Sequence, residues 1–193
     1  MRRLILLALT LGAIAAAPRV HAQDADRTLC FSLNTENYKD KEKFIAGEDA
    51  CSRMIATKSF KGKPLAAMHR ARGSWRQKKG DLDAALADYA TAIKIEPKNV
   101  ESFDYRADVY QQKGDLDRAL ADYDRASKLD PLYAAAHFSR GMIFEKKKDL
   151  GKAREEYNTA IKLPTKDRIA QWAQDNARTR LKALDEDGKD EKK

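Results

Sequence analysis

The chain has 193 residues, of which 35% are charged, and a formal net charge of +8. Loss of Arg2, Arg3 and Arg19 with the first segment would lower this charge to +5. The remaining basic residues are spread along the chain, so nucleic acid is not an expected partner. The sequence has no phosphate-binding glycine loop and no nucleophile motif with a base in register, so we expect neither enzyme activity nor a cofactor.

Residues 1–22 have the features of a secretory signal peptide. Arg2 and Arg3 precede an apolar run, residues 4–17, that is too short to span a bilayer. The run is followed by an A-x-A-like site, Val20-His21-Ala22. We therefore predict cleavage after Ala22, which leaves no transmembrane anchor; the alternative is an uncleaved anchor.

Cys30 and Cys51 are the two cysteines of the chain. In an exported protein an even number of cysteines favours a disulfide, and two cysteines allow one intramolecular pairing. The alternative, a catalytic or metal-binding thiol, lacks a C-x-x-C motif and a nearby cluster of ligands, so no metal site is expected.

Residues 41–58 have the periodicity of an amphipathic helix. The residues expected on one face are Phe44, Ile45, Glu48, Cys51, Met54 and Ile55. We expect the disulfide to pin a preceding strand-like or loop segment to this helix, and residues 59–64 to form a linker.

Four kinds of residue then recur at a spacing of 34 along the chain. They are Gly73, Ala107 and Gly141; Ala85, Ala119 and Ala153; Tyr89, Tyr123 and Tyr157; and Ala92, Ala126 and Ala160. A longer stretch of amino-acid sequence also repeats. Residues 79–89 read KGDLDAALADY and residues 113–123 read KGDLDRALADY. A fixed period of this length predicts an array of stacked units, whose surface binds, rather than one core with a reactive pocket.

Each unit holds two apolar-periodic stretches, which predicts a helix, a turn and a second helix. The expected helices cover residues 66–79, 82–95, 100–113, 116–129, 134–147 and 150–163. Gly80 and Gly114 suit the left-handed conformation that ends a helix, whereas Lys148 stands at that place in the third unit and should be slightly strained. Asp81, Asp115 and Asp149 are expected to cap the helices that follow.

This spacing of small residues, aromatics and prolines resembles the tetratricopeptide repeat, or TPR. The resemblance implies an all-α fold, a short right-handed α-solenoid of three TPR helix-turn-helix units with an added helix at each end. The expected segments are a signal peptide (1–22), an N-terminal segment with a degenerate half-repeat and the disulfide (23–65), TPR 1 (66–99), TPR 2 (100–133), TPR 3 (134–165), a capping helix (166–184) and a disordered tail (185–193). The capping helix carries Ile169, Trp172, Ala173, Ala177, Leu181 and Leu184 on one stripe.

The chain also resembles small exported TPR proteins of alpha-proteobacteria. The matching residues are Cys30, Ala50-Cys51 through Ile55, Arg72-Gly73, Asp88-Tyr89, Asp122-Tyr123 and Arg140-Gly141. This resemblance implies a periplasmic location and a role in binding a peptide or partner protein. The alternative is an envelope structural factor that binds anionic glycan or lipid through a basic convex face.

Two recurring sets of polar residues have structural interpretations. Arg72, Arg106 and Arg140 recur together with Asp88, Asp122 and Glu156, and we predict an arginine–carboxylate pair inside each unit. His69 and His137 lie 68 residues apart at the same place in different units, so we expect them to pack rather than to share a metal. Near Arg76, where the family has a large apolar residue, either Trp75 replaces it or the helix is rotated.

In TPR proteins four positions of each first helix line a concave groove. Here the resemblance assigns Ala67, Arg70, Ser74 and Gln77, then Glu101, Asp104, Asp108 and Gln111, then Ala135, Phe138, Met142 and Glu145. The places of the family's carboxylate clamp hold Arg70, Ser74, Tyr105, Ala135 and Ser139, so capture of an acidic C-terminus is not expected. We expect instead a ligand with a cationic segment, met by Asp104 and Asp108, beside an apolar anchor held by Phe138 and Met142. The alternative is a solvated groove with no specific ligand.

Overall fold

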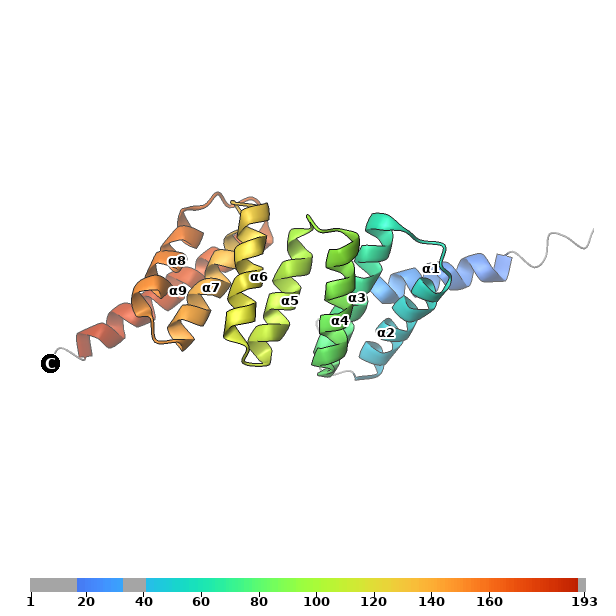
Figure 1. The fold of residues 1–193 in the computed structure, drawn as a ribbon, viewed down its shortest axis with the longest axis horizontal. Helices are drawn as coiled ribbons and strands as arrows, with labels where there is room; N and C mark the ends of the chain where they lie inside the picture. The colour runs from blue at the N-terminus through green and yellow to red at the C-terminus, as the bar shows by residue number, and fades with distance from the viewer. Residues whose placement is uncertain (1–16, 33–40, 191–193) are drawn as a thin grey trace, which may run out of the picture.

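The structure is a computed structural model that describes residues 17–32 and 41–190, and the secondary structure of these residues is entirely helical. The helices are α1 (Ala17–Phe31), α2 (Lys41–Ala56), α3 (Gly62–Lys79), α4 (Leu82–Ile95), α5 (Val100–Gln112), α6 (Leu116–Leu129), α7 (Ala134–Lys146), α8 (Leu150–Lys162) and α9 (Arg168–Asp190). They follow one another along an elongated solenoid with α1 and α9 at opposite ends (Figure 1). The all-α prediction is confirmed.

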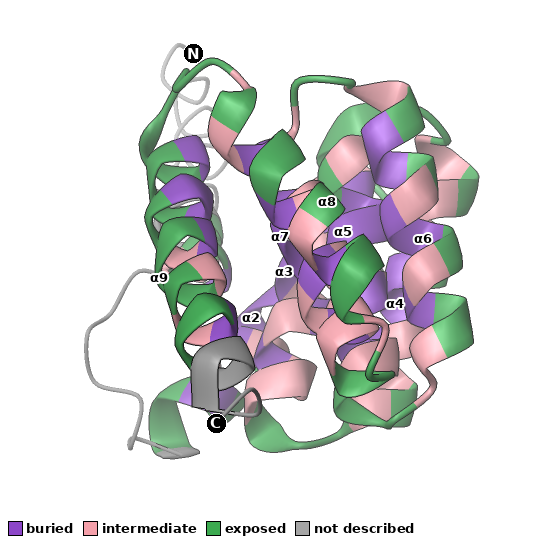
Figure 2. Ribbon diagram, turned by 90° about the vertical axis from the view of Figure 1, so that its left-hand side faces the viewer, coloured by how far each residue is buried: buried purple, intermediate pink, exposed green. Residues whose placement is uncertain are grey.

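Each hairpin closes around a tyrosine from its second helix. Tyr89, Tyr123 and Tyr157 are fully buried, and the buried surface runs through the middle of the array (Figure 2). A methyl group added to Gly73 would lie 2.7 Å from the ring of Tyr89, and one added to Gly141 would lie 2.5 Å from the ring of Tyr157. The glycines therefore permit the close helix approach that the sequence predicted.

The turns inside the hairpins use left-handed residues. Gly80 and Gly114 have φ values of 93° and 79°, and Lys148 takes the same conformation with a φ of 62°. Lys148 has a Cβ, so it carries the strain predicted for the third turn. The side chains of Asp115 and Asp149 accept a hydrogen bond from the first turn of the next helix, as predicted, whereas Asp81 pairs with Lys79 instead.

The predicted arginine–carboxylate pairs are present in all three hairpins. Arg72 and Arg106 each donate two hydrogen bonds to an aspartate, Asp88 and Asp122, at 2.7–2.9 Å. In the third hairpin Arg140 lies 2.8 Å from Glu156. The histidines join these clusters, because His69 lies 2.8 Å from Asp88 and His137 lies 2.9 Å from Glu156.

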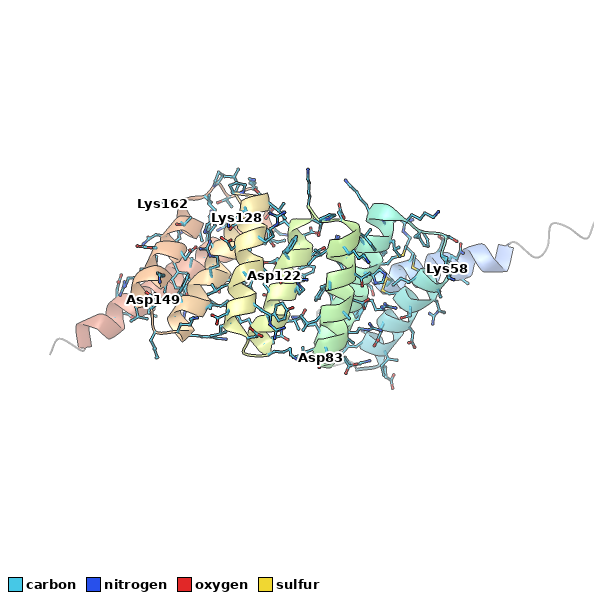
Figure 3. All side chains as sticks on the ribbon, viewed as in Figure 1. Lys58, Asp83, Asp122, Lys128, Asp149 and Lys162 are labelled. Carbon is cyan, nitrogen blue, oxygen red and sulfur yellow. A yellow bond between two sulfur atoms is a disulfide. The ribbon has the colours of Figure 1, made fainter. Side chains whose placement is uncertain are left out.

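A second set of ion pairs runs along one edge of the solenoid. Lys113 lies 2.6 Å from Asp83, and Lys147 lies 2.6 Å from Asp117, so each pair joins one hairpin to the next. Figure 3 shows Asp83 and Asp149 at this edge and Lys128 at the opposite edge. These aspartates are exposed, so the pairs contribute little to stability.

The N-terminal segment differs from the prediction in one respect. Cys30 is bonded to Cys51, as predicted, but it lies on helix α1 rather than on a strand or loop. The indole of Trp75 explains the helical packing, because it donates a hydrogen bond to the Cys30 carbonyl at 2.9 Å. Arg76 pairs with Glu48 and with Asp88, so Trp75 takes the apolar role. Of the predicted signal peptide, residues 1–16 lie outside the described residues and residues 17–22 belong to α1.

The linker expected at residues 59–64 is shorter in the structure. Helix α3 begins at Gly62, so Pro64 lies in its first turn, where a proline costs no helical hydrogen bond. The helix therefore starts four residues before the expected position.

The C-terminal helix is longer than predicted. Helix α9 continues to Asp190, through most of the segment expected to be a disordered tail; residues 191–193 lie outside the described residues. Arg154 of α8 holds α9 where the extension begins, because it pairs with Asp185 and donates to the Leu184 carbonyl at 2.6 Å. None of the described helices is long and apolar enough to cross a membrane.

Candidate functional site

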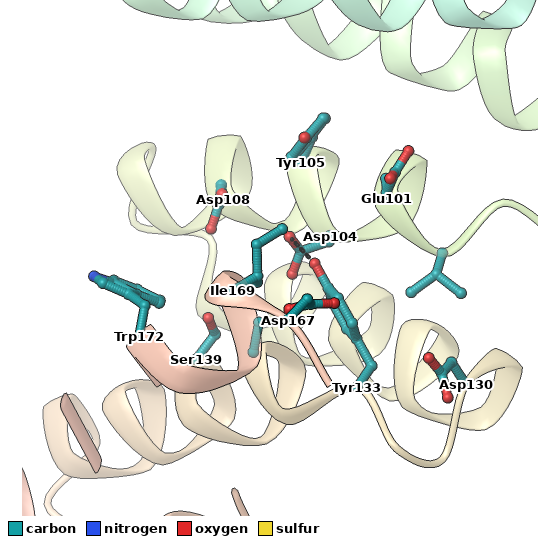
Figure 4. Close-up of a pocket in the computed structure, with 12 residues that line it drawn as sticks. Glu101, Asp104, Tyr105, Asp108, Asp130, Tyr133, Ser139, Asp167, Ile169 and Trp172 are labelled. Atoms are coloured by element: carbon teal, nitrogen blue, oxygen red, sulfur yellow. Dashed lines mark hydrogen bonds between the residues drawn. The ribbon is translucent and has the colours of Figure 1, made fainter. Parts of the chain in front are cut away.

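A pocket of about 370 Å³ opens between α5, α7 and the start of α9 (Figure 4). It is lined by Val100, Glu101, Asp104, Tyr105, Asp108, Asp130, Tyr133, Ala135, Ser139, Asp167, Ile169 and Trp172. Five of these side chains are carboxylates and none is basic. The pocket therefore presents negative charge in a chain whose net charge is positive.

Two carboxylates one helical turn apart form the floor of the pocket. Asp104 is 8% exposed and accepts a hydrogen bond from the hydroxyl of Tyr133 at 2.9 Å. Asp108 accepts one from the hydroxyl of Tyr123 at 2.5 Å. Burial, together with the neighbouring charge of Asp108, raises the pKa of Asp104 to about 7, and burial raises the pKa of Asp108 in the same direction. A bound cation would favour ionisation of both groups.

Basic residues near this pocket are already paired at its margin. Arg70 of α3 lies 2.9 Å from Glu101, and Lys166 lies 3.7 Å from Asp130. Neither lysine nor arginine reaches Asp104 or Asp108 among the described ion pairs. Burial of a carboxylate without a cationic partner disfavours its ionised form.

Aromatic side chains flank the acidic floor. Tyr105 and Tyr133 line the pocket from α5 and from the turn before α7, and Trp172 lines it from α9 (Figure 4). Trp172 is 53% exposed and rests edge-on against Phe138, with ring centroids 5.2 Å apart. An exposed indole beside carboxylates suits a guanidinium or an ammonium group with apolar neighbours.

The predicted groove residues of the first two units are engaged within the chain. The hydroxyl of Tyr89 lies 3.0 Å from both Ser74 Oγ and Gln77 Oε1. The hydroxyl of Tyr123 contacts Gln111 at 3.2 Å in addition to Asp108. These polar side chains hold buried tyrosine hydroxyls, which would otherwise be unsatisfied.

The predicted apolar anchor at Phe138 and Met142 is wrong. Phe138 is only 3% exposed, and Met142 packs against the same core cluster, because α9 of the chain covers this part of α7. Glu145 is also occupied, since it accepts a hydrogen bond from Tyr157 at 2.8 Å and pairs with Arg180 of α9. Helix α9 instead offers Ile169 and Trp172, which the sequence placed on a capping stripe.

The described residues contain no group of three or more histidine, cysteine, aspartate or glutamate side chains that could hold a metal ion.

The positions that hold the carboxylate clamp in the family also have little capacity to bind a carboxylate here. Ser74 is bonded to Tyr89, and Arg70 is paired with Glu101. Tyr105, Ala135 and Ser139 line the acidic pocket.

Sequence comparison identifies the repeats. Residues 106–168 match the family model described as Tetratricopeptide repeat, and residues 77–114 match the one described as TPR repeat. A search of curated protein sequences found no match.

Several solved structures share the fold. A tetratricopeptide repeat protein from Parabacteroides merdae superposes with a TM-score of 0.62 at 18% identity, covering 83% of this chain and 61% of its own length. The chain thus spans about three fifths of that protein. The type III secretion translocator chaperone SycD of Yersinia enterocolitica gives a TM-score of 0.60 at 15% identity, covering 67% of this chain and 95% of its own.

The first TPR of Spaghetti (RPAP3), bound to the HSP90 peptide SRMEEVD, gives a TM-score of 0.52 at 21% identity, covering 63% of this chain and 96% of its own. At these identities the likeness concerns the fold. Together with the matches to residues 77–114 and 106–168, it shows tetratricopeptide repeats over residues 77–168 of this chain.

Proposed function

We propose that this protein is a periplasmic interaction scaffold that binds a peptide or partner protein through the pocket between α5, α7 and α9. The observation that supports this proposal is the pair Asp104 and Asp108. These are two largely buried carboxylates in an open pocket that has no basic lining residue. Their only described hydrogen-bond partners are tyrosine hydroxyls, so no described basic residue offsets their charge when they ionise.

The ligand is expected to carry a cationic segment beside an apolar group. An arginine or lysine side chain of the ligand would enter between Asp104 and Asp108, and its neighbour would pack on Trp172 and Ile169. Trp172 and Ile169 thus take the anchoring role that the sequence had assigned to Phe138 and Met142, which α9 covers. Complementary charge speeds association, and contact with the exposed indole slows dissociation.

The RPAP3 repeat provides a contrast. Its bound peptide, SRMEEVD, is acidic. In the present chain the middle of the groove is itself acidic, and Arg70 is paired with Glu101. A peptide of that composition is therefore expected to be repelled here, while one of opposite charge is attracted.

The test is a pair of double variants assayed against a partner isolated by pull-down from a periplasmic extract. Asp104→Asn with Asp108→Asn keeps an oxygen acceptor for each tyrosine and removes the charges of the two central carboxylates, leaving the other three carboxylates of the pocket. We expect affinity to fall by at least about tenfold, since loss of one member of a buried charge pair costs roughly 2–5 kcal/mol. The matched control, Asp117→Asn with Asp124→Asn on α6, removes two charges outside the pocket and should bind normally. Unchanged or tighter binding by the pocket variant would remove the proposal.

Salt separates this function from binding of anionic glycan or lipid by a convex face. Exposed charge contacts are screened over about 10 Å at 0.1 M salt, so binding of a polyanion would be lost while apolar contact with Trp172 persists.

Export is tested by intact-mass measurement on protein from the cell envelope. A chain that begins at Gln23 and has no free thiol is expected. Retention of Met1 would contradict export through a cleaved signal peptide.

A further inference from the structure

A second cavity, of about 550 Å³, lies between α1, the end of α2 and the start of α3. Helix α1 supplies one wall through Gln23, Asp24, Arg27 and Phe31, all of which follow the predicted cleavage site. The opposite wall is formed by Met54, Phe60, Pro64, Ala67 and Met68. This volume is within the roughly 300–1,000 Å³ of small-ligand sites.

The lining of this cavity favours an aromatic guest. Met54 and Met68 bring two thioethers, which are adaptable and make favourable contacts with ring edges. Phe31 is 44% exposed although it lines the cavity, so a guest would cover apolar surface that water now contacts. The only charged lining residues, Asp24 and Arg27, have opposite signs, so the cavity as a whole selects a neutral group.

A short series of neighbouring residues links the lining of this cavity to that of the acidic pocket. Ala67 lies one turn before Arg70 on α3, and Arg70 lies 2.9 Å from Glu101, which lines the acidic pocket. Ala67, Arg70 and Glu101 thus form a path between the two concavities. An extended ligand on this path would reach both.

The disulfide fixes the wall that makes the cavity. Cys30 lies one residue before Phe31, and its bond to Cys51 holds α1 against α2. The Cys30 carbonyl is also held by the indole of Trp75 on α3. Helix α1 is therefore attached to both helices that form the opposite wall.

We propose that this cavity receives an aromatic side chain of the same peptide ligand whose cationic group enters the acidic pocket. The inference rests on the proposed function and adds a second anchor point. It predicts a bipartite ligand, with an aromatic residue toward α1 and a basic residue toward α9. Neither part alone should bind as tightly as the two joined.

Methionine methyl signals provide a direct readout of this cavity. Met54 and Met68 line it, whereas Met142 lies under α9 and serves as an internal control. With ¹³C-methyl-labelled protein, a neutral pentapeptide with one central tryptophan between glycine and serine residues should shift the signals of Met54 and Met68 and leave that of Met142. Ala67→Phe should abolish these shifts by filling the cavity, and Ala90→Phe, at an exposed site on α4, should not.

The cationic half is probed separately. The same peptide with arginine in place of tryptophan should lose binding in the Asp104→Asn and Asp108→Asn double variant, which should keep the tryptophan-induced shifts. A peptide that joins both halves through a flexible glycine-serine linker should bind at least about tenfold more tightly than either half. Reduction of the disulfide should weaken binding of the tryptophan peptide more than that of the arginine peptide.

Three results would overturn the inference. They are unmoved Met54 and Met68 signals, shifts that survive Ala67→Phe, and a joined peptide that binds no more tightly than the tighter half. If the tryptophan peptide fails while the arginine peptide still binds in a manner dependent on Asp104 and Asp108, the inference falls and the proposed function stands.

Discussion

The contact between Gly47 and Trp75 predicts that Gly47→Ala lowers the stability of this protein but raises the stability of a variant that lacks the Trp75 ring. A methyl group added to Gly47 would lie 2.3 Å from the Trp75 ring, and that ring is buried and tethered to Cys30. Overpacking of this kind costs about 1–3 kcal/mol. The helix-propensity gain from glycine to alanine returns about 1 kcal/mol. Because the ring cannot move freely, we expect Gly47→Ala to destabilise the protein by up to about 2 kcal/mol.

Replacement of Trp75 by alanine removes the Cε2, Nε1 and Cδ2 atoms that the new methyl group would meet. In the Trp75→Ala background, Gly47→Ala should therefore stabilise the protein, since only the propensity gain of about 0.5–1 kcal/mol remains. Urea unfolding followed by circular dichroism measures both values. At a slope of about 2 kcal/mol per molar urea, the first change lowers the midpoint by up to about 1 M. The same sign in both backgrounds would refute this reasoning.

Three further predictions concern stability. Arg106→Lys should cost about 1–2 kcal/mol in urea unfolding, because lysine cannot make the two-point contact with largely buried Asp122, whereas Arg118→Lys at an exposed site should leave the midpoint unchanged. Cys30→Ser with Cys51→Ser should cost about 3 kcal/mol in the same assay, the loop-closure estimate for a 21-residue separation, and a loss below about 1 kcal/mol would contradict it. Burial raises the pKa of Asp104 from 3.8 to about 7, so the folded state binds more protons and stability should fall as pH rises from about 4 to about 7. Thermal melts of Asp104→Asn should show a flatter profile there, and those of the charge-matched exposed variant Asp175→Asn should not.

The repeated part of the fold was predictable from the sequence because its signals are local and occur more than once. Gly73, Tyr89 and their counterparts 34 and 68 residues later identify the face on which two helices meet. The same recurrence paired Arg106 with Asp122 correctly, since a spacing of 16 residues joins the two helices of a hairpin. Periodicity thus predicted both the hairpins and their internal ion pairs.

The ends of the solenoid were less predictable because nothing in the chain repeats them. Helix α1 occurs once, and its helical state depends on packing with Trp75 and Cys51. The coverage of Phe138 by α9 depends on where the helix turns after residue 163, which the repeat does not specify. The acidic half of the site followed from groove positions Asp104 and Asp108. Its aromatic wall from α9 did not, because Trp172 lies outside the repeats.

The tyrosine hydroxyls of the hairpins have a consequence for evolution and engineering of the binding face. Gln77, Asp108, Gln111 and Glu145 face the groove side but also satisfy tyrosines at the centre of their hairpins. A substitution that changes specificity at these places therefore removes a hydrogen-bond partner of a core hydroxyl, and a hydroxyl that loses all its partners costs about 1–3 kcal/mol. Ala67 has no such duty, so new specificities should be obtained most readily by varying it and the ion pair of Arg70 with Glu101.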